Sequence, residues 1–150
     1  MKIKQANKEE IEKSLEIASN LTKWFTKEAI KKMKKTFNKD LIISRDKKVL
    51  GFLNYKINKG SITILWMGVA PDSIRKGIGT RLLKELEKIA RNKKINKIRV
   101  ETLTYEDGYK PYKNTRKFYI KNSFIYKWIR KAKNKNHDDV VIMEKILKCT

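Results

Sequence analysis

Residues 62–103 read ITILWMGVAPDSIRKGIGTRLLKELEKIARNKKINKIRVETL. This stretch predicts a strand, a loop that begins at Pro71, a helix and a second strand, in that order. Apolar residues recur at helical spacing in the second third of the stretch, while charged residues fill most positions between them. One side of the helix is therefore expected to face the core. The apolar positions are Ile78, Leu82, Leu83, Leu86, Ile89 and Ala90.

The segment RKGIGT (75–80) lies between the first of these strands and the helix. Its two glycines let the backbone approach a ligand closely, and the first amides of a helix lack partners within it. Together with Arg75 and Lys76, these groups predict a binding site for a phosphate group. The segment is not a P-loop, because GxxxxGK[ST] is absent, and Leu82 stands where a dinucleotide fingerprint needs glycine. An ordinary strand-to-helix turn is the alternative interpretation.

The same segment resembles motif A of the GNAT N-acetyltransferase superfamily, Q/R-x-x-G-x-G/A, which follows a strand ending in V-x-P. Here the strand ends at residues 69–71 (VAP), and two glycines occupy the glycine positions. Ile74 departs from the motif, because it stands where Gln or Arg is usual. The resemblance implies acetyl-CoA as the co-substrate, with its pyrophosphate at the start of the helix. The residues implied for its binding are Met67, Gly68, Val69, Arg75, Lys76, Gly77, Ile78, Gly79 and Thr80.

A second segment, TRKFYIKNSF (115–124), is similar to GNAT motif B, A-x-x-F-Y-x-x-x-G-F. Thr115 and Ser123 replace the usual Ala and Gly, so Asn122 or Ser123 is expected to make the turn that ends the helix. The two motifs occur in the family's order and together cover residues 62–124. Two loose motifs in the correct order are more specific than either alone. The matching residues of motif B are Phe118, Tyr119 and Phe124.

The predicted elements follow the order β-α-α-β-β-β-α-β-α-β-β. This order indicates an α+β fold, with a mostly antiparallel mixed sheet of about six to seven strands and about four helices. A single domain is expected over residues 1–150. Asn7 and Thr26 are the predicted N-caps of the first two helices.

Two details concern the last third of the chain. A short helix is predicted from about Asn114 to Asn122, after a loop marked by Pro111. Residues 124–130 alternate as a strand, with Phe124, Tyr126 and Trp128 expected on one side.

Acetyl transfer to an amine needs a base for the amine, donors for the oxyanion and an acid for the departing thiolate. The resemblance implies direct attack in a ternary complex, with backbone amides of residues 67–69 near the oxyanion. Tyr119 is the candidate acid, because a phenol has a pKa close to that of the leaving thiol. Glu101 is the candidate base, with Glu106 and Asp107 behind it. Candidates for the acceptor side are Trp24, Trp66, Tyr105, Glu106 and Asp107.

Each of these side chains also has a purely structural interpretation. Tyr119 and the tryptophans are of a type that often packs in a core, and Glu101 could form an ion pair with a neighbouring cation. The single cysteine, Cys149, has no neighbour that would activate it as a nucleophile. This is consistent with direct attack.

The chain of 150 residues carries a formal net charge of +22. Such a charge attracts polyanions and repels polycations, so it suits an anionic co-substrate and disfavours polyamine acceptors. A solvated, lysine-rich surface is the alternative explanation, because the lysines are spread along the whole chain. No apolar run is long enough to span a bilayer, and the N-terminus lacks the apolar core of a signal peptide. A cytoplasmic location is therefore expected.

The predicted function is that of an acetyl-CoA-dependent N-acetyltransferase that acts on a primary amine of a small molecule or peptide. No metal is expected, and the protein is expected to be a monomer or a homodimer. The alternative is a regulatory module with the same fold that binds acyl-CoA or nucleic acid without catalysis. Basic charge favours nucleic acid, but no stacking or base-reading motif supports it. The sequence does not identify the acceptor, because acceptor-selecting loops diverge freely on one fold.

Overall fold

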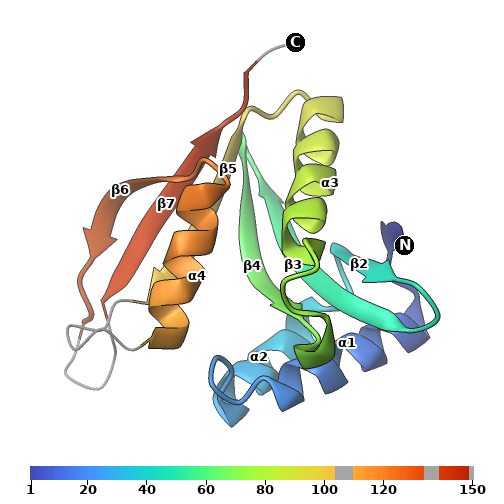
Figure 1. Ribbon diagram of the computed structural model, residues 1–150. Coiled ribbons are helices and arrows are strands. Elements are labelled where there is room, and N and C mark those ends of the chain that lie inside the picture. The colour runs from blue at the N-terminus through green and yellow to red at the C-terminus, as the bar shows by residue number, and fades with distance from the viewer. Residues whose placement is uncertain (104–109, 134–138, 149–150) are drawn as a thin grey trace. The chain divides into compact units, whose positions relative to one another are not determined.

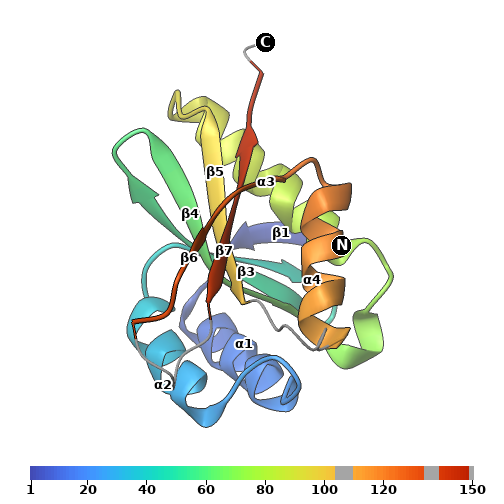
Figure 2. The same ribbon diagram turned by 90° about the vertical axis from the view of Figure 1, so that its left-hand side faces the viewer.

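The computed structural model describes residues 1–103, 110–133 and 139–148 (Figures 1 and 2). A short 3-10 turn, η1 (Pro71–Ser73), precedes the third helix. The order of helices and strands predicted from the sequence is confirmed. The elements are β1 (Lys2–Gln5), α1 (Lys8–Asn20), α2 (Lys27–Thr36), β2 (Leu41–Arg45), β3 (Val49–Asn58), β4 (Ser61–Val69), α3 (Ile78–Asn92), β5 (Lys97–Leu103), α4 (Lys110–Lys121), β6 (Ile125–Arg130) and β7 (Val140–Ile146).

The strands form one mixed sheet in the order β1-β2-β3-β4-β5-β7-β6. The pairs β1–β2, β2–β3, β5–β7 and β6–β7 are antiparallel, which agrees with the predicted sheet. The chain folds as two compact units. The first unit comprises Met1–Lys56 and Ile64–Ile89, and the second comprises Ile57–Thr63 and Ala90–Thr150. The single domain expected over residues 1–150 stays a prediction.

The helices α1 and α2 of the first unit begin at the predicted caps. The Asn7 side chain accepts from the Glu10 amide while the Glu10 carboxylate accepts from the Asn7 amide, which is a reciprocal capping box. Thr26 accepts from the Ala29 amide in the same way. Both helices pack their apolar sides onto a buried cluster with β2 and β3. Its buried members are Ile17, Ala18, Leu21, Met33, Phe37, Leu41, Ile43, Val49, Phe52 and Ala70.

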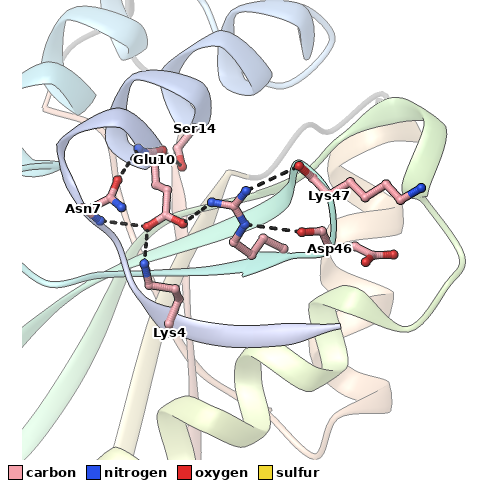
Figure 3. Close-up of polar contacts among 7 residues, drawn as sticks. Lys4, Asn7, Glu10, Ser14, Asp46 and Lys47 are labelled. Carbon is pink, nitrogen blue, oxygen red and sulfur yellow. Dashed lines mark hydrogen bonds and ion pairs between the residues drawn. The ribbon is translucent and has the colours of Figure 1, made fainter.

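Glu10 is a buried carboxylate that joins α1 to β1 and to the end of β2 (Figure 3). Its two oxygens accept from Lys4 Nζ and Arg45 Nη1, each at 2.8 Å. Burial raises the pKa of this carboxyl. The hydrogen bonds from Lys4, the Asn7 amide and Arg45 outweigh that effect, and together they lower the pKa from 4.5 to about 2. Glu10 is therefore ionised across the neutral range, and its charge is matched by two cations.

Gly68 on β4 lies against the ring of Phe52, which is fully buried on β3. A Cβ at Gly68 would lie 2.9 Å from Phe52 Cε1 and Cζ and 3.0 Å from Leu21 Cδ1. The absence of a side chain at Gly68 is thus needed for packing inside the first unit.

We expect Gly68→Ala to destabilise the fold by about 1–3 kcal/mol, because the added methyl overpacks a rigid core. Urea unfolding followed by circular dichroism measures the change. In the double variant Gly68→Ala/Phe52→Leu, the smaller side chain should recover part of the loss beyond simple additivity. Additive effects of the two substitutions would contradict this packing explanation.

The second unit contains α4, β5, β6 and β7, with β7 hydrogen-bonded between β5 and β6 (Figure 1). One side of β5 is buried and consists of Ile98, Val100 and Thr102, as alternation predicts. The opposite side of β5 carries Arg99 and Glu101, which are more exposed.

The helix α4 begins at Lys110, several residues before the predicted start near Asn114. The prediction was wrong because it took Pro111 as a loop residue. Proline is tolerated in the first turn of a helix, where its missing N–H would have had no helical acceptor. Thr115 Oγ1 donates to the Pro111 carbonyl at 3.0 Å, which confirms that this turn is helical.

The strand β6 departs from the predicted alternation. Tyr126 lies opposite Met143 and Trp128 lies opposite Ile142, and the register shifts between them. Lys127 is thus the extra residue of a β-bulge, which places Tyr126 and Trp128 on opposite faces. The expectation that they share one face was wrong, because a bulge leaves no reliable mark in a period-2 pattern.

Candidate functional site

The loop between β4 and α3 contains two residues in the left-handed region. Arg75 has φ 71° and Gly77 has φ 75°. Gly77 adopts this conformation without strain, whereas at Arg75 it costs on the order of 1 kcal/mol. A strained residue that a fold retains at a loop often marks a ligand site. The loop therefore has a defined shape rather than a generic turn.

The helix α3 begins at Ile78, and the Arg81 amide donates to the Gly77 carbonyl at 3.1 Å. The amides of residues 78–80 precede this bond, so the helix offers them no carbonyl. Arg75 and Lys76 are exposed beside them. A Cβ at Gly77 would meet nothing within 4 Å, so there is open space at the helix start. These groups suit an anion such as a pyrophosphate.

An ion pair braces the beginning of this loop. Lys48, in the turn between β2 and β3, donates to Asp72 Oδ2 at 2.7 Å, and Ser73 Oγ donates to Asp72 Oδ1 at 3.1 Å. The hydrogen bond from Lys48 is the main reason why the pKa of Asp72 is lowered. Sequence reasoning missed this contact, because no local pattern connects residues so far apart in the chain. Ile74, the departure from motif A, is extended and exposed next to it.

The predicted strand residues Met67, Gly68 and Val69 lie at the end of β4. Met67 and Val69 are half-buried, while Gly68 is buried against Phe52. The amides of residues 67–69 as oxyanion donors stay a prediction.

Two of the candidate acceptor residues, Trp24 and Trp66, pack against the core of the first unit. Trp66 on β4 makes an edge-to-face contact with Phe25, at 6.1 Å between ring centroids. Trp24 precedes Phe25, and both tryptophans are half-buried against the core. Their partial exposure leaves room for a contact with an acceptor beside their packing role.

Tyr119 lies on α4 and is 4% exposed. Its ring contacts the rings of Phe118 and Phe124 at centroid distances of 5.3 and 5.2 Å. Ser123, with φ 73°, makes the turn that ends α4, and the Phe124 amide donates to the Tyr119 carbonyl at 3.0 Å. The predicted turn is thus made by Ser123. Burial raises the pKa of Tyr119 above its ordinary value of 10, so its phenol is neutral throughout the physiological range.

Glu101, the candidate base on β5, accepts two hydrogen bonds from Arg130 on β6, each at 2.9 Å. The sequence suggested that this carboxylate could form an ion pair, but it did not indicate Arg130. In this bidentate pair, each oxygen of the carboxylate directs one lone pair at the guanidinium. The second lone pair of each Glu101 oxygen is left over by these two bonds, and the role of Glu101 as a base stays a prediction.

The candidates Tyr105, Glu106, Asp107 and Cys149 lie outside the described residues. Within the described ranges, no group of three or more His, Cys, Asp or Glu side chains could hold a metal ion. The described helices also include none that is long and apolar enough to cross a membrane.

The described residues thus form an α+β fold, a seven-stranded mixed sheet with four helices, in which a glycine-containing loop precedes α3. The sequence profile of the acetyltransferase (GNAT) family matches residues 6–119, which is most of the chain. The chain therefore belongs to the GNAT acetyltransferase family. No curated relative matches it.

Several solved structures are similar over nearly the full length. A GNAT-family protein from Desulfovibrio desulfuricans has a TM-score of 0.82 at 20% identity, covering 97% of this chain and 98% of that one. The ribosomal-protein-S18-alanine N-acetyltransferase from Escherichia coli has a TM-score of 0.78 at 15% identity, covering 99% and 95%. The PaiA N-acetyltransferase from Thermoplasma acidophilum, solved with coenzyme A, has a TM-score of 0.72 at 24% identity, covering 97% and 98%. At these identities the likeness shows the fold.

Proposed function

We propose that the protein transfers an acetyl group from acetyl-CoA to a primary amine by direct attack in a ternary complex. The observation that carries this proposal is the loop at the start of α3, where exposed cations and open space surround unpaired helix amides. The coenzyme A complex of the similar PaiA structure supports the same co-substrate. The thioester of acetyl-CoA supplies the activated acetyl group.

In this proposal Arg75 and Lys76 attract the pyrophosphate, and the amides of residues 78–80 bind its oxygens. Gly77 ends the loop, and Gly79 and Thr80 lie in the first turn of α3. The amides of residues 67–69 on β4 stabilise the oxyanion that forms during transfer. Trp24 and Trp66 contribute to the acceptor side.

Tyr119 donates a proton to the sulfur as the thiolate departs. Its raised pKa keeps the donating form fully populated. The raised pKa also makes Tyr119 a weaker acid than a free phenol, so its match with the leaving thiol is less close than the sequence suggested.

The acceptor amine must lose a proton, and Glu101 is the candidate for this step. The bonds from Arg130 leave a second lone pair on each carboxylate oxygen, which can accept from the amine. The net charge of +22 favours a neutral or acidic acceptor over a polycation. A peptide or small molecule with few positive charges fits this condition.

We expect Gly77→Ala to weaken coenzyme A binding about tenfold, because the added Cβ occupies the space into which the phosphates fit. Gly60→Ala is the matched control. Gly60 has φ 80° and, like Gly77, has no atom within 4 Å of an added Cβ. Both substitutions carry a similar left-handed strain of about 1 kcal/mol. Isothermal titration with coenzyme A would contradict the site if both variants bound like the wild type.

Reversal of charge in the loop should have a larger and salt-dependent effect. We expect Arg75→Glu/Lys76→Glu to weaken coenzyme A binding about 30-fold at low ionic strength, and much less in high salt. The control, Lys88→Glu/Arg91→Glu, makes the same change in net charge on exposed positions about 15 Å further along α3. Equal losses in both variants would place the pyrophosphate elsewhere.

A further inference from the structure

The strand β6 is an open edge in the second unit. It pairs with β7, and among the described residues no strand pairs with its other side (Figure 2). All of its residues are exposed. An edge of this kind presents unpaired backbone N–H and C=O groups to solvent. Of the eight large exposed hydrophobic residues in the described chain, four lie on β6, at 48–55% exposure: Ile125, Tyr126, Trp128 and Ile129.

The bulge at Lys127 distributes these side chains over both faces of the strand. Ile125 lies opposite Glu144 and Trp128 opposite Ile142, so both are on one face, while Tyr126 and Ile129 are on the other. An extended peptide added at this edge would direct its side chains alternately to the two faces. They would contact Ile125 and Trp128 on one face, and Tyr126 and Ile129 on the other. The edge therefore offers apolar contacts in addition to backbone hydrogen bonds.

Trp128 makes a cation–π contact with Arg99, which is itself held by an ion pair. The Arg99 guanidinium lies 5.1 Å from the centre of the Trp128 ring, and Arg99 bonds Glu144 at 2.8 Å. Glu144 is almost fully buried, so it fixes the guanidinium. Arg130 is held by Glu101 on the same face. A large, partly exposed aromatic residue is typical of the anchors of protein interfaces.

The charges along the edge select the kind of partner. Four cationic residues lie within residues 127–133, with no acidic residue between them: Lys127, Arg130, Lys131 and Lys133. Arg130 and Lys131 have carboxylate partners, whereas Lys127 and Lys133 are exposed and form no ion pair with the described part of the chain. A second copy of this chain would bring a further +22 to an edge that is already basic, so charge repulsion opposes pairing of two copies.

We propose that β6 is a docking edge for an extended acidic peptide of a partner protein, which adds to the sheet as a strand. Apolar residues of the peptide contact Ile125 and Trp128 on one face and Tyr126 and Ile129 on the other, and its carboxylates face Lys127 and Lys133. The open backbone favours a peptide over a nucleic acid, because its unpaired N–H and C=O groups match those of an added strand.

The test uses a short fluorescent peptide of alternating glutamate and valine, titrated with the full chain and followed by anisotropy. We expect saturable binding that weakens with salt. A peptide with lysine in place of glutamate, and one with alternate amides N-methylated, should each bind at least about tenfold more weakly.

Lys127→Glu should weaken binding of the acidic peptide about tenfold, while Lys113→Glu, an exposed change of equal charge on α4, should not. Ile129→Thr is a second variant, which keeps strand propensity and removes apolar contact.

Three outcomes would overturn the proposal. Undiminished binding of the N-methylated peptide would exclude strand addition. Tighter binding of a single-stranded oligonucleotide, with the same dependence on Lys127, would make the edge a nucleic-acid site. A dimer in sedimentation that Trp128→Asp dissociates would make it an interface between copies. None of these outcomes depends on acetyl transfer, so the proposed function is tested separately.

Discussion

Replacement of Tyr119 by phenylalanine should reduce the rate of acetyl transfer about 10²- to 10³-fold while the affinity for coenzyme A stays within about twofold of the wild type. The substitution removes one hydroxyl from a side chain that is otherwise held by Phe118 and Phe124. Packing of the ring is therefore retained. What is lost is the proton for the departing thiolate, which acts only in the transition state.

The matched control is Tyr55→Phe. Tyr55 is also buried, and its hydroxyl accepts a hydrogen bond from the side chain of Gln5 on β1. This variant loses a comparable hydroxyl and should transfer acetyl at the wild-type rate. Stopped assays of free coenzyme A measure the rate, and calorimetry measures the affinity. Wild-type turnover in Tyr119→Phe would remove Tyr119 from the mechanism.

The pH dependence of kcat is a second test of Tyr119 as the acid. Burial raises the pKa of Tyr119 above 10, so the acid is present at every pH below that value. We expect kcat to show no descending limb up to pH 10, because the phenol is not yet ionised. A descending limb near pH 8 that is absent in Tyr119→Phe would contradict the burial of the acid.

Loss of the charge at Glu10 should have the largest effect on stability. The pKa of Glu10 falls from 4.5 in the unfolded chain to about 2 in the fold. Such a shift corresponds to at most about 3 kcal/mol, since Lys4 and Arg45 are partly exposed and solvent screens them. A group with a lowered folded pKa stabilises the fold above its unfolded pKa. That contribution is fully present at neutral pH and disappears as the pH falls from about 4.5 to about 2.

Glu10→Gln should therefore lower the free energy of unfolding at pH 7 by up to about 3 kcal/mol, because two cations lose their partner. Urea denaturation measures this change. The glutamine oxygen can still accept from the Asn7 amide, so the cap is largely kept. Glu9→Gln, an exposed neighbour in the same turn, is the control and should change stability by less than about 0.5 kcal/mol. The difference between wild type and Glu10→Gln should narrow toward pH 2. A difference that is constant with pH would mean that packing, not charge, is responsible.

The local signals in the sequence were sufficient for the elements and for most of their ends. Asn7 and Thr26 cap helices because their side chains accept from amides within one turn, which is information contained in a few residues. The helix α3 follows from its apolar spacing in the same way. By contrast, the early start of α4 at Lys110 depends on a proline that is compatible with both a loop and a first helical turn.

Contacts across strands were the part that the sequence did not contain. The bulge at Lys127 and the pairing of Glu101 with Arg130 depend on how three strands align, and register is a tertiary property. Likewise, the packing role of Gly68 depends on Phe52 from the next strand, whereas the sequence suggested only passage of a ligand. The position of the candidate loop could be predicted from the sequence, but the left-handed conformation of Arg75 could not.

The central claim is that the loop at the start of α3 binds acetyl-CoA for transfer to an amine. The most direct measurement incubates the protein with acetyl-CoA and a panel of neutral, acidic and cationic amines, and follows free coenzyme A together with the mass of each amine. The account predicts release of coenzyme A that depends on the amine, a product heavier by one acetyl group, and loss of both in Arg75→Glu/Lys76→Glu at low salt. Absence of acetylated product with every amine, together with no binding of acetyl-CoA, would contradict it.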